Sequence, residues 1–127
     1  MHTKERPSLK RDLDLARRIL EDVEVNASFN EGWYELNIKD YPTDVLYYHV
    51  MLLHQAGLLE AQDLSTHDGR RWLPKWLTWE GHEFLDAARD SGRWSKAVAL
   101  VKTKTGGLAF DVLKAVLVDL AKKAAIG

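Results

Sequence analysis

The stretch TDVLYYHVMLLHQAGLLEA, residues 43–61, constrains the fold more than any other part of the chain. Its apolar residues recur at spacings of three and four, which predicts a helix with one buried side. Thr43 is the expected N-cap. Gly57 is the expected helix stop, because glycine readily adopts the left-handed conformation in which many helices end. Residues 58–64 then predict a strand, so a helix is expected to run directly into a strand.

A second strand, residues 70–77, is expected to pair with the first one. The turn between them, Ser65–Gly69, contains an Asp-Gly dipeptide, a strong short signal for a β-hairpin. Pro74 has no backbone N–H, so the second strand is expected to lie at a sheet edge or to contain a bulge there. Thr78 is the expected cap of the helix that follows, TWEGHEFLDAARD.

The chain before residue 43 predicts a helix and a short strand. After an N-terminal arm over residues 1–7, a helix is expected to begin with Ser8 as its N-cap. Residues 33–39 alternate between apolar and polar side chains and predict a strand. The helix is expected to bury an apolar stripe made of Leu9, Leu13, Ala16, Leu20 and Val23, with Ile19 beside it.

The chain after residue 90 predicts two more helices. Ser91-Gly92 is expected to interrupt the chain, and a helical pattern follows through Trp94, Ala97, Val98 and Val101. Gly106-Gly107 is expected to end that helix, and residues 108–126 predict a last one.

The order helix, strand, helix, β-hairpin wing, helix resembles a winged-helix module. The run Leu77-Thr78-x-x-Gly81-x-x-x-Leu85 commonly follows the wing in such proteins, where the threonine caps the helix and the glycine permits close packing on the hairpin. The resemblance implies an α+β fold: a single winged-helix-like domain over residues 8–127, extended by two C-terminal helices over about residues 91–127.

More closely, the chain resembles a family of bacterial and phage-borne proteins, the domain of unknown function 2513 family. This resemblance implies no activity. Only Asp40-Tyr41-Pro42 separates the expected strand from the central helix, which is too short for the additional helix of a regular helix-turn-helix. The matching residues are Lys10-Arg11-Asp12, Asp14-Leu15, Tyr48-His49, Leu52-Leu53, Ala56-Gly57-Leu58, Leu77-Thr78-Trp79, Gly81 through Asp86, and Trp94.

The composition predicts a non-enzymatic protein without a cofactor or a metal. The 127 residues include no cysteine, and the five histidines are scattered. His49 and His54 would point about 140° apart on a helix, so they do not converge on one ion. We expect His49 to be a hydrogen-bonded core residue and His82 to contact Asp86. No apolar run is long enough to span a membrane, and the N-terminus is charged, so a cytoplasmic location is expected.

Two kinds of partner remain open: double-stranded DNA and protein. The outer arc of the central helix holds no Lys or Arg, and residues 26–65 have a single base, Lys39. If DNA is the partner, we expect the wing residues Arg70, Arg71 and Lys75 to contact phosphates and Tyr47, His54 and Gln55 to face the groove. If protein is the partner, we expect Tyr47, Tyr48 and Met51 to form the interface. The C-terminal helices are a candidate surface for a homodimer.

Overall fold

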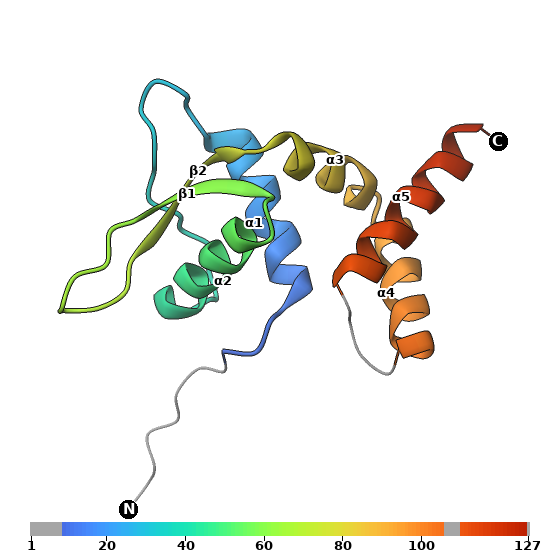
Figure 1. The fold of residues 1–127 in the computed structure, drawn as a ribbon, viewed down its shortest axis with the longest axis horizontal. Helices are drawn as coiled ribbons and strands as arrows, with labels where there is room; N and C mark the ends of the chain where they lie inside the picture. Colours follow the sequence, from blue (N-terminus) through green and yellow to red (C-terminus); the bar gives the residue numbers. More distant parts are fainter. Residues whose placement is uncertain (1–8, 106–109, 127) are drawn as a thin grey trace, which may run out of the picture. The chain divides into compact units, whose positions relative to one another are not determined.

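The computed structural model describes residues 9–105 and 110–126, and it has an α+β fold (Figure 1). Contacts group the chain into two compact units that divide between Gly81 and His82. Within the described residues the first unit holds two helices and an antiparallel two-stranded hairpin, an order compatible with a winged-helix-like arrangement. The elements are α1 (Leu13–Asn26), α2 (Thr43–Gln55), β1 (Leu59–Asp63), β2 (Trp72–Leu77), α3 (Trp79–Ala88), α4 (Ser91–Thr105) and α5 (Phe110–Ile126).

The first helix begins later than predicted. Helix α1 starts at Leu13, and its N-cap is Asp12, whose Oδ1 accepts a hydrogen bond from the Leu15 N–H at 3.1 Å. Ser8, the predicted cap, and the predicted arm over residues 1–7 lie outside the described residues. Leu9 is 55% exposed and does not join the apolar stripe. The other residues of the predicted stripe, together with Leu15, are buried.

His49 joins the start of α1 to the middle of α2. Its Nε2 accepts a hydrogen bond from the Asp12 N–H at 2.9 Å, and its Nδ1 donates to the Val45 carbonyl at 2.8 Å. Only the neutral ring protonated on Nδ1 can make both bonds. The side chain is 1% exposed, so both polar atoms are satisfied inside the core. The prediction of a hydrogen-bonded core histidine is confirmed.

The predicted strand at residues 33–39 is wrong: the segment is extended but forms no strand ladder. The Tyr34 N–H donates to the Pro74 carbonyl at 3.2 Å. Pro74 has no N–H to return, so this pairing cannot continue as a regular ladder. The predicted alternation of apolar and polar side chains nevertheless identifies buried residues correctly, because Leu36 and Ile38 are both buried. Figure 1 shows the segment as part of the connection that leads from α1 to α2.

Helix α2 ends as predicted, but its N-cap position lies one residue earlier than predicted. Its N-cap position is Pro42, which makes no side-chain cap, and Thr43 is already helical, so the predicted threonine cap is wrong. At the other end Gly57 has φ +78°, and its N–H donates to the His54 carbonyl at 3.0 Å. The Leu58 N–H reaches back to the Leu53 carbonyl at 3.0 Å. These two bonds form a complete Schellman motif, which ends the helix and starts the chain toward β1.

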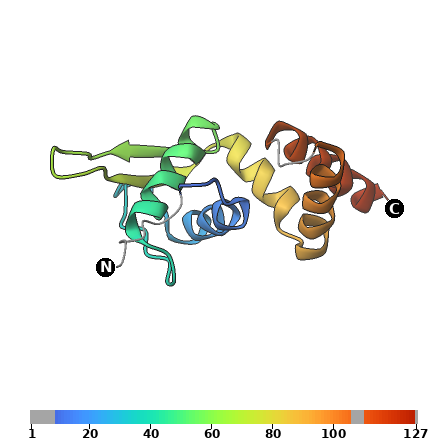
Figure 2. The ribbon, with the colours of Figure 1, turned by 90° about the horizontal axis from the view of Figure 1, so that it is seen from below.

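Strands β1 and β2 form the predicted hairpin, and both expectations for Pro74 are met. The partners shift between Glu60 and Ala61, which pair with Trp76 and Pro74, so Lys75 is the extra residue of a bulge. The two strands make up the whole sheet of the described residues, so both are edge strands. The tip closes through paired hydrogen bonds between Thr66 and Gly69. Figure 2 shows the hairpin projecting beyond α1 and α2.

Thr78 and Gly81 bring the start of α3 against the start of the hairpin. The Thr78 hydroxyl oxygen accepts from the Gly81 N–H at 3.0 Å and donates to the Gly57 carbonyl at 2.6 Å. The Thr78 N–H donates to the Leu58 carbonyl at 3.1 Å. A Cβ on Gly81 would lie 1.8 Å from that same carbonyl oxygen. The predicted cap and the predicted close packing are both confirmed.

The second unit packs α4 and α5 around a small aromatic core. Phe84 contacts Trp94 and Phe110, with ring centroids 6.3 Å and 5.3 Å away. The predicted interruption at Ser91-Gly92 is the first turn of α4, and the Asp90 carboxylate caps it by accepting from the Arg93 N–H at 2.8 Å. The predicted stop at Gly106-Gly107 lies outside the described residues. In the part of the chain that the structure describes, no helix is long and apolar enough to cross a membrane.

Gly81→Ala is expected to destabilise the fold. The added methyl group would overlap the Leu58 carbonyl, so the backbone at Gly81 and the backbone at Leu58 would have to move apart. The free energy of unfolding should fall by about 3 kcal/mol, the upper end of overpacking costs. Urea unfolding followed by circular dichroism measures this. Gly92→Ala is the matched control, because the nearest atom to its Cβ is a side-chain oxygen at 3.3 Å. Equal effects of the two substitutions would contradict the expected overlap.

Candidate interaction surface

Arg71 is the centre of a cluster that three segments build. The residue precedes β2, and its guanidinium forms an ion pair with Glu35 of the extended segment. The guanidinium carbon also lies 5.4 Å from the centre of the Trp33 ring. Hydrogen bonds to Glu35 and, secondarily, to Tyr47 of α2 raise the pKa of Arg71 above its usual value. We call Trp33, Glu35, Tyr47 and Arg71 the Arg71 cluster.

Tyr34 fixes the extended segment that supplies two members of the cluster. Its hydroxyl donates to Asp22 Oδ2 on α1 at 2.7 Å, while its N–H bonds the hairpin at Pro74. Burial and, next, the Asp22 hydrogen bond raise the pKa of the Tyr34 phenol well above its usual value. Because neighbouring side chains of an extended chain point to opposite sides, anchoring Tyr34 turns Trp33 and Glu35 outward toward Arg71.

A second group of aromatic side chains gathers at Trp76 of β2. Phe29 contacts Trp76 with ring centroids 4.8 Å apart, and the Lys75 ammonium lies 5.7 Å from the centre of the Trp76 ring. Phe29 is 81% exposed and Trp33 is 40% exposed. We call Phe29, Lys75 and Trp76 the aromatic edge. Large exposed aromatic side chains that gather on one unit mark a candidate binding surface.

Two of the three predicted phosphate contacts of the wing have a close neighbour in the structure. Arg71 is paired with Glu35, and Lys75 lies against Trp76. Arg70 is exposed, and its charge helps to lower the pKa of Asp63, after the larger effect of the hydrogen bonds from Ser65. Residues 58–77 also carry equal charge of both signs: Glu60, Asp63 and Asp68 against Arg70, Arg71 and Lys75. The hairpin therefore has no surplus of positive charge.

The predicted groove-facing residues of α2 have different environments. His54 Nδ1 lies 3.3 Å from the Leu59 carbonyl, and its ring packs against Trp72 at 5.6 Å, so this side chain holds α2 to the hairpin. Gln55 is exposed at the end of the helix. Tyr47, the third, belongs to the Arg71 cluster.

The predicted protein-interface residues are only partly accessible. Tyr47, Tyr48 and Met51 are each half-buried, and the Tyr48 ring packs edge-on against His49 at 5.7 Å. Phe29, Trp33 and Glu35 were not predicted as site residues. Trp33 and Glu35 lie in the predicted strand, and the usable signal in the sequence is that two large aromatic residues, Phe29 and Trp33, stand close together in the chain.

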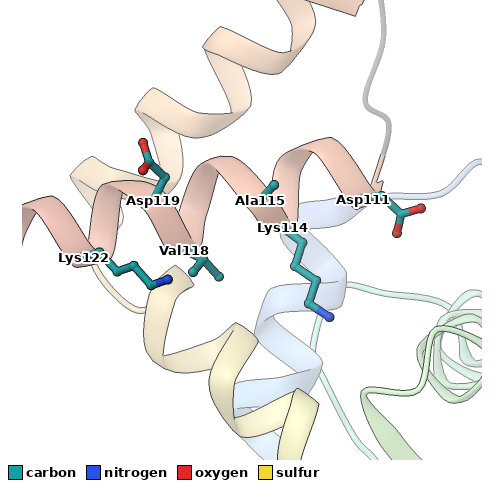
Figure 3. A pocket seen from close by; sticks show the side chains of 6 residues that line it. All are labelled: Asp111, Lys114, Ala115, Val118, Asp119 and Lys122. Atoms are coloured by element: carbon teal, nitrogen blue, oxygen red, sulfur yellow. The ribbon is translucent and has the colours of Figure 1, made fainter.

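The described residues offer no group of three His, Cys, Asp or Glu side chains that could hold a metal ion. His82 was expected to contact Asp86, but the Asp86 carboxylate is paired with Arg89 at 2.8 Å. A separate open hollow of about 400 Å³ lies along α5 (Figure 3). It is lined by Asp111, Lys114, Ala115, Val118, Asp119 and Lys122.

Comparison with known proteins agrees with the resemblance seen in the sequence. The model of the family described as "Hypothetical protein (DUF2513)" matches residues 10–107. The chain belongs to the DUF2513 family. A similar protein is an "Uncharacterized protein" of Haemophilus influenzae (strain ATCC 51907 / DSM 11121 / KW20 / Rd), 32% identical over 108 residues, which cover 85% of this chain and 92% of the relative. No solved structure matches the chain.

Tyr34→Phe is expected to loosen the segment that carries Trp33 and Glu35. Loss of the hydrogen bond to Asp22 should lower the free energy of unfolding by about 1 kcal/mol at neutral pH. The raised pKa has a second consequence. Above pH of about 10 the unfolded chain releases the phenol proton while the folded chain keeps it, so wild-type stability falls as pH rises.

Urea unfolding at neutral and alkaline pH measures both effects. The Tyr34→Phe variant should lose less stability between the two pH values than the wild type does. Tyr41→Phe removes a phenol from the end of the same segment and is the matched control. An alkaline loss in Tyr34→Phe as steep as in the wild type would rule out this role for Tyr34.

Proposed function

We propose that this DUF2513 protein is a non-enzymatic regulatory binding module that recognises a protein partner through the Arg71 cluster and the aromatic edge. The observation that carries the proposal is the state of Arg71, whose guanidinium is paired with Glu35 and lies 5.4 Å from the centre of the Trp33 ring. A phosphate would have to compete with Glu35 for this guanidinium. The same arrangement suits a protein partner, because interfaces are enriched in aromatic residues and arginine and depleted of isolated charges.

Two further features support a protein partner over duplex DNA. The aromatic edge offers large side chains with few rotatable bonds, which are typical of the residues that dominate binding energy at interfaces. Helix α2, which would occupy the recognition position of a winged-helix protein, contains no Lys or Arg from Thr43 to Gln55. Duplex binding depends mainly on the neutralisation of phosphates by such residues.

Duplex DNA is the second candidate, and one observation favours it. The hairpin projects from the first unit and presents exposed Arg70 near its tip, as a wing that reaches a DNA backbone would (Figure 2). The two candidates differ in what Glu35 does. In the protein proposal Glu35 withdraws Arg71 from phosphate, so removing its charge should release that arginine.

Glu35→Gln is therefore expected to create or strengthen duplex binding. Fluorescence anisotropy with a labelled mixed-sequence duplex, at about 50 mM and 200 mM salt, measures it. The wild type should bind the duplex weakly, and the variant should bind it more tightly. A plot of the logarithm of the binding constant against the logarithm of the salt concentration should be steeper for the variant by about 0.9, the value for one added phosphate contact. Glu31→Gln, which removes one exposed charge from the same part of the chain, is the control. Strong, salt-sensitive binding by the wild type, lost in Arg70→Ala, would instead support the DNA candidate.

Trp33→Ala is expected to weaken binding to protein ligands. Peptides selected from a display library on the wild-type protein serve as the probe. Their affinity, measured by calorimetry, should fall by at least about tenfold, or about 1.4 kcal/mol, because an exposed aromatic contact is lost. Trp79→Ala is the control, because Trp79 is 79% exposed and lies at the start of α3. Selected peptides that bind Trp33→Ala and wild type equally would count against the Arg71 cluster as the binding surface.

A further inference from the structure

Helix α5 carries a stripe of alternating charge on the side opposite its core. Leu113 and Leu117 are fully buried and define the inner side of the helix. An α-helix turns by about 100° per residue, so six other residues of α5 lie, on average, on the side opposite Leu113 and Leu117. Figure 3 shows them along the one helix: Asp111, Lys114, Ala115, Val118, Asp119 and Lys122. We call these six residues the α5 stripe.

The α5 stripe is complementary to itself when two copies run antiparallel. A two-fold axis that crosses the helix between residues 116 and 117 places Asp111 opposite Lys122 of the second copy. The same axis places Lys114 opposite Asp119 and Ala115 opposite Val118. Every charge in the stripe then meets an opposite charge, and the small apolar residues meet at the centre. We propose that the protein forms an antiparallel homodimer through the α5 stripe.

Other occupants fit the charge pattern less well. A parallel copy in register would place each charge against the same charge. A partner surface of a single sign, such as a nucleic acid backbone or an anionic membrane, would be repelled by two of the four charges. A two-fold dimer uses the same surface on both copies, and the α5 stripe meets this requirement of self-complementarity.

The α5 stripe has the steric properties that a helix pair needs. Ala115 is exposed and Val118 is half-buried, and both are small enough for two helices to approach closely. Asp119 also forms an ion pair with Lys123 of its own helix at 3.0 Å, but an exposed pair of this kind is weak and can be shared. The helix of 17 residues is about 25 Å long, which is enough for one short interface. We expect micromolar or weaker association that added salt weakens further.

Two variants, in each of which the four charges of the α5 stripe have the same sign, test the dimer. Lys114→Asp/Lys122→Asp makes the stripe wholly acidic, and Asp111→Lys/Asp119→Lys makes it wholly basic. By sedimentation velocity over a concentration series, each variant alone should show a dimer dissociation constant raised by at least about tenfold over the wild type. An equimolar mixture should recover the dimer, because all four pairs are again opposite in charge.

The recovery in the mixture makes the test independent of any loss of stability in one variant. Lys96→Asp/Lys102→Asp changes two exposed lysines of α4 and alters the net charge as the acidic variant does, so it should dimerise like the wild type. A wild type that stays monomeric at all concentrations would overturn the proposal. So would variants that dimerise alone as strongly as the wild type, or a mixture that stays monomeric. The proposal stands independently of the Arg71 cluster and its partner.

Discussion

The first unit depends on a buried polar contact between its two helices. His49 sits in the middle of the most apolar helix of this unit, yet both of its ring nitrogens are bonded, one to Val45 of its own helix and one to the backbone of Asp12. That second bond falls at the N-cap of α1, where backbone N–H groups have no partner within the helix. Asp12 caps α1 with its side chain while its own N–H is held by His49. The start of α1 is thereby set by α2, which explains why α1 begins at Leu13 and not nearer the chain terminus.

The local signals of the sequence predicted the hairpin and its surroundings well. Gly57, Thr78 and Gly81 act through short-range chemistry: a left-handed turn, a side-chain cap and a missing Cβ. Each of these can be recognised from a few neighbouring residues, and each has its expected role in the structure. The predicted strand at residues 33–39 failed for a different reason. Alternation correctly identified which side chains are buried, but strand formation also needs a partner edge with both donors and acceptors, and here Pro74 lacks its donor.

The candidate site was less predictable, because it is made of pairs between distant residues. The sequence shows Arg71 as an available cation in a basic and aromatic strand. Its actual partners, Glu35 and Trp33, lie far back in the chain and meet it only because Tyr34 is fixed to α1 and to the hairpin. Charge counts cannot reveal such pairing. One of the acids within residues 26–65, Glu35, is used in the structure to pair with Arg71.

Pro74 and the bulge at Lys75 also bear on solubility. A two-stranded hairpin that projects from a small domain exposes unpaired backbone groups, which can template strand addition between molecules. On β2, Pro74 removes one donor, Lys75 interrupts the regular spacing, and the Tyr34 N–H already occupies the Pro74 carbonyl. The edge therefore has neither the continuous run of free groups nor the flatness that a growing β-aggregate requires. The features that prevent a third strand within the protein should equally prevent one from a neighbouring molecule.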